Sequence, residues 1–110
     1  MIRKFSAAFA GIRKGLGHRA VAMQFVLAGL ALAAAAILRL DAMEWIAVII
    51  CTGLVISTEM LNTCIEKLCD LYTDAYNEQV GLIKDMAAGA VLVSSLCALI
   101  TALIILGRHL

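Results

Sequence analysis

Three acidic residues and one amide recur at helical spacing in the middle of the chain. Glu59, Asn62, Glu66 and Asp70 are separated by three, four and four residues, so they share one helical face about 80° wide. A carboxylate on such a face can accept a proton from an alcohol, or bind Mg²⁺ together with phosphate oxygens. Lys84 could neutralise charge on a transferring phosphoryl group. The pattern fits phosphoryl transfer to a lipid alcohol without singling that reaction out.

This polar face lies in a very apolar chain. The 110 residues are 64% hydrophobic and 15% charged, with no proline, whereas soluble domains are about 45–50% apolar and about 25% charged. The composition excludes a disordered chain, a coiled coil and a nucleic-acid binder, and it predicts a single membrane-embedded domain over residues 1–110. The cysteines lack C-x-x-C spacing, so we expect no disulfide framework.

Three long uncharged or nearly uncharged runs predict an all-α fold with three transmembrane helices. Each run is close to the roughly 20 apolar residues that cross a bilayer, and the predicted spans are 20–38, 45–65 and 86–107. Residues 1–17 place apolar side chains on one stripe, which predicts an amphipathic helix lying on the membrane surface. The stripe consists of Ile2, Phe5, Phe9, Ile12 and Leu16. Small residues around Gly29 and 33–36 predict close helix packing and make oligomerisation plausible.

Lysine and arginine positions predict the orientation of the chain. Seven of the nine precede residue 20 or lie between the second and third spans, so the positive-inside rule predicts a cytoplasmic amino terminus and a cytoplasmic loop at 66–85. With Trp45 as the outer interfacial anchor, Glu59 lies roughly 21 Å into the bilayer. An ionisable group at that depth is a candidate functional residue, and the alternative is a protonated or hydrogen-bonded structural acid.

The segment around the polar face resembles a known family. E-x-x-N-x-x-x-E-x-x-x-D at 59–70, followed by K-D-x-A-A-G-A-V from Lys84, is similar to the signature of the bacterial integral-membrane diacylglycerol kinase and undecaprenol kinase family. The resemblance implies a homotrimer in the bacterial cytoplasmic membrane that transfers the γ-phosphoryl of MgATP to undecaprenol or diacylglycerol. The A-A-G-A-V segment is closer to the undecaprenol kinase branch.

The same resemblance assigns roles to individual residues. Glu59 matches the general base, and Asn62 matches a polar residue of the same catalytic site. Glu66 matches a carboxylate that binds both the metal and the nucleotide. The remaining matched positions are on the nucleotide side: Asp70, Tyr76, Asn77, Lys84 and Asp85.

Two departures from the family pattern stand near the amino terminus. The family places a second metal-binding Glu at the start of the first span, where this chain reads Gly17-His18-Arg19-Ala20. An aromatic residue of the surface helix corresponds to Ala7. His18 or water could complete the metal shell, Arg19 could contact phosphate directly, or catalysis could be impaired.

Three other interpretations fit parts of the sequence. A kinase-derived protein of reduced activity fits the missing acid. A small proton-coupled multidrug transporter fits the length and a membrane-embedded Glu59, but such transporters have four spans with the acid in the first. An accessory subunit explains the small residues but not the aligned acids.

Overall fold

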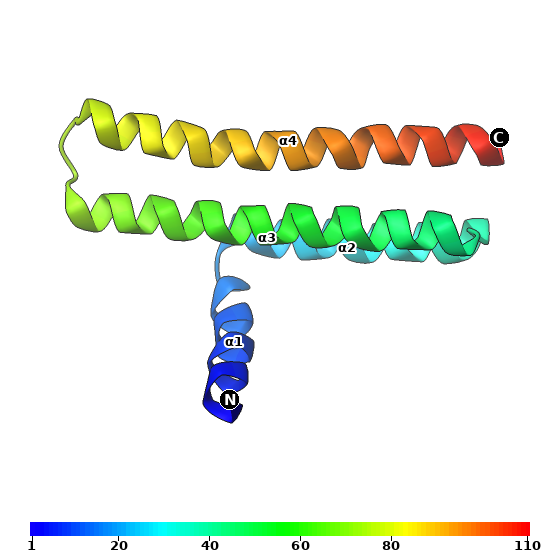
Figure 1. The fold of residues 1–110 in the computed structure, drawn as a ribbon, viewed down its shortest axis with the longest axis horizontal. Helices are drawn as coiled ribbons and strands as arrows, with labels where there is room; N and C mark the ends of the chain where they lie inside the picture. The colour runs from blue at the N-terminus through cyan, green and yellow to red at the C-terminus, as the bar shows by residue number, and fades with distance from the viewer.

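The computed structural model describes all 110 residues as four helices with short connections. In chain order they are α1 (Ile2–Gly15), α2 (Arg19–Leu38), α3 (Ala42–Tyr72) and α4 (Glu78–His109). α2, α3 and α4 run along the long axis of the molecule, and α1 leaves this bundle sideways (Figure 1). The predicted all-helical fold is confirmed.

Three helices are long and apolar enough to cross a membrane, as the sequence predicts. α3 and α4 contain 31 and 32 residues, or about 46 and 48 Å at 1.5 Å per residue. Both exceed the roughly 30 Å of a bilayer core. The helices therefore extend well beyond the segments 45–65 and 86–107.

The predicted loop at 66–85 is wrong over most of its length, because only Thr73–Asn77 separates α3 from α4. The Asn77 side-chain oxygen accepts the backbone N–H groups of Gln79 and Val80 at 3.0 and 3.1 Å. This N-cap starts α4 before the apolar span, since it satisfies donors that a helix start leaves unpaired. We call this end of the bundle the loop end.

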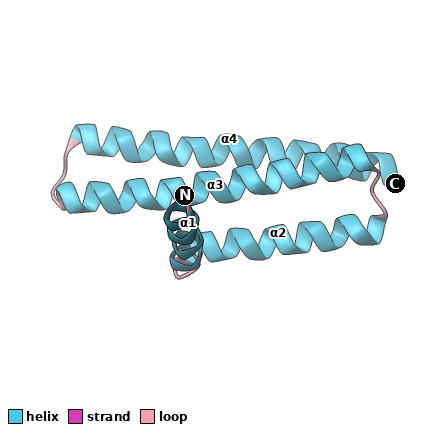
Figure 2. Ribbon diagram, turned by 60° about the horizontal axis from the view of Figure 1, so that its bottom comes forward, coloured by secondary structure: helices cyan, strands magenta, loops and turns pink.

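α3 is the central helix of the bundle and packs against both α2 and α4 (Figure 2). The buried core is small: Ala35, Leu40 and Ile105 form its centre, with Trp45 packed against them. Only nine residues are buried, so most apolar side chains are available to lipid or to another chain. Of the small residues expected to pack helices, Ala35 is buried, whereas Gly29 is exposed.

The opposite end of the bundle, which we call the turn end, reverses the chain in three residues. Arg39 adopts a left-handed conformation with φ of 56°, and the backbone N–H of Leu40 donates to the Ala35 carbonyl at 3.2 Å. Asp41 and Glu44 then form a capping box, in which each side chain accepts the other's backbone N–H. These bonds end α2 and begin α3 without a longer loop.

Four charged or titratable side chains join α3 to α4 at the turn end. The buried Glu44 carboxylate contacts His109 Nε2 at 3.0 and 3.1 Å. Arg108 lies 3.5 Å from both Glu44 and Asp41. We call Asp41, Glu44, Arg108 and His109 the clasp. Glu44 lies just before the span 45–65. Its hydrogen bond with His109 lowers the pKa of the Glu44 carboxyl group most, and its hydrogen bond with the Asp41 backbone lowers it further.

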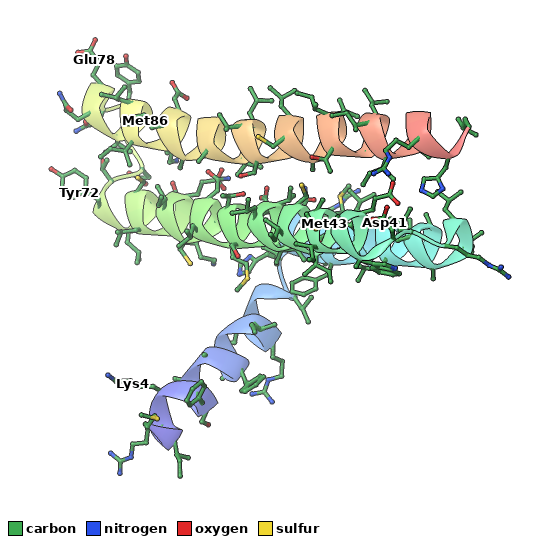
Figure 3. All side chains as sticks on the ribbon, turned by 45° about the vertical axis from the view of Figure 1, so that its right-hand side comes forward. Lys4, Asp41, Met43, Tyr72, Glu78 and Met86 are labelled. Atoms are coloured by element: carbon green, nitrogen blue, oxygen red, sulfur yellow. The ribbon has the colours of Figure 1, made fainter.

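α1 leaves its apolar side chains uncovered. None of its residues is buried, and Ile2, Phe5 and Phe9 are more than half exposed. Lys4 projects from α1 far from the rest of the bundle (Figure 3). The helix is present close to the predicted range 1–17, and its position on a membrane surface stays a prediction.

The clasp generates a prediction on stability. Glu44→Gln should lower the melting temperature of the purified protein at pH 7, because it removes the charge that His109 and Arg108 face. Since the folded-state pKa of Glu44 is depressed, its contribution is present above the usual carboxyl pKa and is lost as the pH falls through the lowered value. The difference in melting temperature between wild type and variant should therefore disappear in acid.

The matched control is Asp74→Asn, which changes an exposed acid in the 73–77 loop that forms no ion pair. It should leave the melting temperature nearly unchanged at every pH. Equal melting temperatures for Glu44→Gln and wild type at pH 7 would contradict a stabilising role of the clasp.

Candidate functional site

The polar face of α3 passes from a buried to an exposed environment toward the loop end. Glu59 and Asn62 are 8% and 9% exposed, whereas Glu66 and Asp70 are exposed. Asn62 Nδ2 donates to Glu66 Oε1 at 3.2 Å, so these two side chains meet, as their spacing predicts. We call these four residues the polar stripe.

The buried half of the polar stripe has unused hydrogen-bonding capacity. No hydrogen bond within the chain involves the Glu59 carboxylate; only its backbone carbonyl accepts, from the Thr63 hydroxyl at 3.0 Å. The buried Asn62 Oδ1 has no partner either. Because most buried polar atoms in folded proteins are paired, the unpaired Asn62 Oδ1 marks a place where a bound molecule or another chain can supply a donor.

The exposed half of the polar stripe is joined to α4. Lys84 Nζ lies 2.8 Å from Asp70 Oδ1. Lys84 lies just before the span 86–107. The hydrogen bond with Asp70 raises the pKa of Lys84, and the negative charge of the nearby Glu66 raises it further. The ammonium group therefore stays charged near neutral pH and sits close to the two outer carboxylates.

The other predicted nucleotide-side residues are not joined to the polar stripe within the chain. Tyr76 is 92% exposed in the 73–77 loop, and Asn77 uses its oxygen to cap α4. Asp85 is exposed on α4 and forms no ion pair. Tyr72 and Glu78 mark the same end of α3 and α4 (Figure 3). The nucleotide-binding roles of these residues stay predictions.

One carboxylate is in a position suited to a metal that arrives with a nucleotide. The chain has no group of three or more His, Cys, Asp or Glu residues that could hold an ion alone. Mg²⁺ commonly takes one or two protein carboxylates, with phosphate oxygens and water as its other ligands. The exposed Glu66 fits this donor set. His18 and Arg19 line separate hollows and form no ion pair with the polar stripe.

A cavity of about 450 Å³ lies between α2, α3 and α4. Thr52 and Val55 line it from α3, and they precede Glu59 by two turns and one turn on the same face. Its other lining residues are mainly small or aliphatic: Gln24, Leu27, Ala28, Ala31, Ser95, Ala98, Leu99 and Ala102. Sequence reasoning missed this cavity, because the small residues that leave it open come from three helices whose pairing the sequence does not state.

The fold and the polar stripe together define an α-helical membrane protein with a carboxylate site at one end of its bundle. Residues 6–106 match the family model described as prokaryotic diacylglycerol kinase. An undecaprenol kinase of Bacillus subtilis (strain 168) is 34% identical over 88 residues, which are 80% of this chain and 67% of that protein. A diacylglycerol kinase of Escherichia coli (strain K12) is 38% identical over 80 residues, covering 73% of this chain and 66% of the relative.

The chain belongs to the prokaryotic diacylglycerol kinase family. The matched part spans about two thirds of the length of these two relatives and 39% of a Synechocystis sp. (strain ATCC 27184 / PCC 6803 / Kazusa) diacylglycerol kinase, which is 38% identical over 68 residues. The predicted family is confirmed, and it is a family of membrane kinases. The four cysteines are free, as expected.

Substitution of Lys84 distinguishes a role in nucleotide binding from a role in stability. An exposed ion pair contributes only about 0–1 kcal/mol to stability, so Lys84→Gln should leave the melting temperature within about 5 °C of wild type. If Lys84 faces the nucleotide phosphates, the same change should weaken ATP binding roughly tenfold, measured by titration calorimetry. The control Lys4→Gln, far out on α1, should change neither value. Unaltered ATP affinity in Lys84→Gln would remove Lys84 from the nucleotide site.

Proposed function

We propose that this protein transfers the γ-phosphoryl group of MgATP to a membrane lipid alcohol, undecaprenol or diacylglycerol. The observation that carries the proposal is the carboxylate of Glu59, a residue only 8% exposed, with which no group of the chain forms a hydrogen bond. It lies on the same helical face as Glu66, which is exposed. A lipid hydroxyl and a water-soluble nucleotide can therefore approach one helix from two different surroundings.

In the proposed reaction, the Glu59 carboxylate accepts the hydroxyl proton while the lipid oxygen bonds to the γ-phosphorus. The bond from that phosphorus to the bridging oxygen breaks, and ADP leaves with the electron pair. Asn62 orients Glu66 through its 3.2 Å hydrogen bond. Glu66 would hold Mg²⁺, which supplies neutralisation of phosphate charge when bound. Lys84 adds a positive charge near the transferred group.

The nucleotide side of the proposed site consists of Glu66, Asp70, Tyr76, Asn77, Lys84 and Asp85. The exposed Asp70 and its contact with Lys84 support this placement at the loop end. We place the protein in the bacterial cytoplasmic membrane with a cytoplasmic amino terminus, because the lysines and arginines gather at that end. A homotrimer with sites shared between protomers follows from the family resemblance, and the unpartnered Asn62 Oδ1 supports an added donor at the site.

A kinase-derived protein of reduced activity is the second candidate. It is favoured by His18 and Arg19, which stand where the family resemblance calls for a metal-binding Glu. The multidrug transporter is disfavoured by three membrane-length helices and by the family match.

The decisive experiment incubates the purified protein with γ-labelled MgATP and either undecaprenol or diacylglycerol in mixed micelles. Labelled lipid phosphate is expected from one or both alcohols, and the ratio of their rates identifies the substrate. Absence of label with both lipids, in protein shown to be folded and oligomeric, would overturn the proposal.

Glu59→Gln tests the general base. The substitution removes the proton acceptor but keeps the size of the side chain, so turnover should fall at least about 10³-fold while ATP affinity stays within about twofold. Rates come from the labelled-lipid assay and affinity from titration calorimetry. The matched control Glu78→Gln, an exposed acid at the start of α4, should retain full turnover. An equal loss of ATP affinity in Glu59→Gln would place Glu59 in the nucleotide site instead.

A further inference from the structure

The cavity of about 450 Å³ between α2, α3 and α4 contains polar side chains within the membrane-spanning part of the bundle. We call it the interhelical cavity. Gln24 lines it from α2 and Ser95 lines it from α4. Leu27 and Leu99, which also line it, are 53% and 54% exposed, so the cavity is open to the surrounding hydrocarbon. Its volume is within the roughly 300–1,000 Å³ that is typical of small-molecule sites.

The side chains of Gln24 and Ser95 have no hydrogen-bond partner within the chain. Hydroxyl groups on helices can donate to a backbone carbonyl of the preceding turn, and those of Thr52, Thr58 and Thr63 do so at 2.9 to 3.0 Å. The Ser95 hydroxyl forms no such bond. Because hydrocarbon offers no acceptor, an unpaired donor in the cavity costs free energy until a bound molecule accepts from it.

Ser95 lies at the same height in the bundle as Glu59. Asp70 and Lys84 are in contact at 2.8 Å, and Glu59 and Ser95 each lie eleven residues from that contact toward the turn end, or about 16 Å along their helices. On α3, the lining residue Val55 precedes Glu59 by one turn on the same face. A lipid whose hydroxyl group is at Glu59 therefore has its next atoms at the height of Ser95.

Gln24 reaches the same region from α2. Val21 and Met60 line one hollow, which indicates the height of α2 against α3. Gln24 follows Val21 by three residues, or about 4.5 Å toward the turn end. Gln24 and Ser95 thus offer an amide N–H and a hydroxyl group within about one helical turn of the height of Glu59.

We propose that the interhelical cavity receives the ester-linked part of diacylglycerol, with the Gln24 amide and the Ser95 hydroxyl donating hydrogen bonds to its two ester carbonyls. The inference rests on the proposed kinase function and chooses between its two lipid alcohols. The ester groups of diacylglycerol begin next to the carbon that carries the hydroxyl group, whereas undecaprenol has no other oxygen. A site built to hydrogen-bond a ligand discriminates against an analogue that leaves its donors unpaired. This preference is opposite to the one that the A-A-G-A-V segment indicates.

The first measurement is lipid binding without ATP, which does not depend on catalysis. Native mass spectrometry of the full chain in neutral detergent compares diacylglycerol with a dialkylglycerol of the same chain length, which keeps the hydroxyl group but has ethers in place of the esters. Wild type should bind diacylglycerol at least about tenfold more tightly. Equal affinities, or no saturable binding of diacylglycerol, would overturn the proposal. The second result is expected if another copy of the chain fills the cavity.

The double variant Gln24→Leu/Ser95→Ala removes both donors with little change in side-chain size. It should lower the affinity for diacylglycerol at least about tenfold and so abolish the preference over dialkylglycerol. The matched control Ser94→Ala removes the hydroxyl of the neighbouring residue on α4, which does not line the cavity, and should keep the preference. An unchanged preference in the double variant, or an equal loss in the control, would overturn the proposal.

If the double variant does not fold, Ser95→Ala alone should reduce the preference at least about threefold, because one donor is lost. An unchanged preference in a folded Ser95→Ala protein would contradict the proposed hydrogen bond.

Turnover separates this proposal from the kinase function. In the labelled-lipid assay, wild type should have a higher kcat/KM for diacylglycerol than for undecaprenol, and the ratio should fall at least about tenfold in Gln24→Leu/Ser95→Ala. Phosphorylation of undecaprenol alone would overturn the diacylglycerol site and leave the kinase function intact. Ester-dependent binding without phosphorylation of either lipid would overturn the kinase function and support a diacylglycerol-binding site.

Discussion

α3 has to remain one unbroken helix while its surroundings change from hydrocarbon to water. In a bilayer core the backbone polar groups must be satisfied within the segment, and a chain without proline meets this requirement over 31 residues. One rigid rod therefore fixes the rise and angle between Glu59 and Asp70. The buried Glu59 and the exposed Glu66 and Asp70 are held in register because the helix between them is continuous.

On the same helix, a carboxylate and an ammonium group of consecutive residues point in different directions around the helix axis. Glu66 and Lys67 are neighbours in the chain, yet Glu66 bonds to Asn62 on the polar stripe, while Lys67 lines a small hollow between α1 and α3. Consecutive residues of a helix point about 100° apart, so these two side chains do not face each other. The Glu66 carboxylate therefore stays free of the neighbouring Lys67 ammonium group.

Much of this arrangement could be predicted from the sequence, because it depends on local periodicity. The three membrane helices, the all-α class and the shared face of Glu59 and Glu66 follow from residue spacing. The length of α4 was misjudged because the N-cap at Asn77 satisfies donors before the apolar run begins. The clasp was missed because Glu44 and His109 are 65 residues apart. The cavities were missed for the same reason, since helix pairing is not a local property.

α3 and α4 are tied together at both ends, by the five-residue connection Thr73–Asn77 at one end and by the clasp at the other. This closed frame resists splaying, since separation of the two helices would have to break one of its ties. α2 is attached differently: three residues at the turn end join it to α3, and its other end continues into the outlying α1. The chain thus joins α2 to the other two long helices at one end only. Widening of the 450 Å³ cavity would therefore meet least resistance at α2, because only α3 and α4 are tied together at both ends.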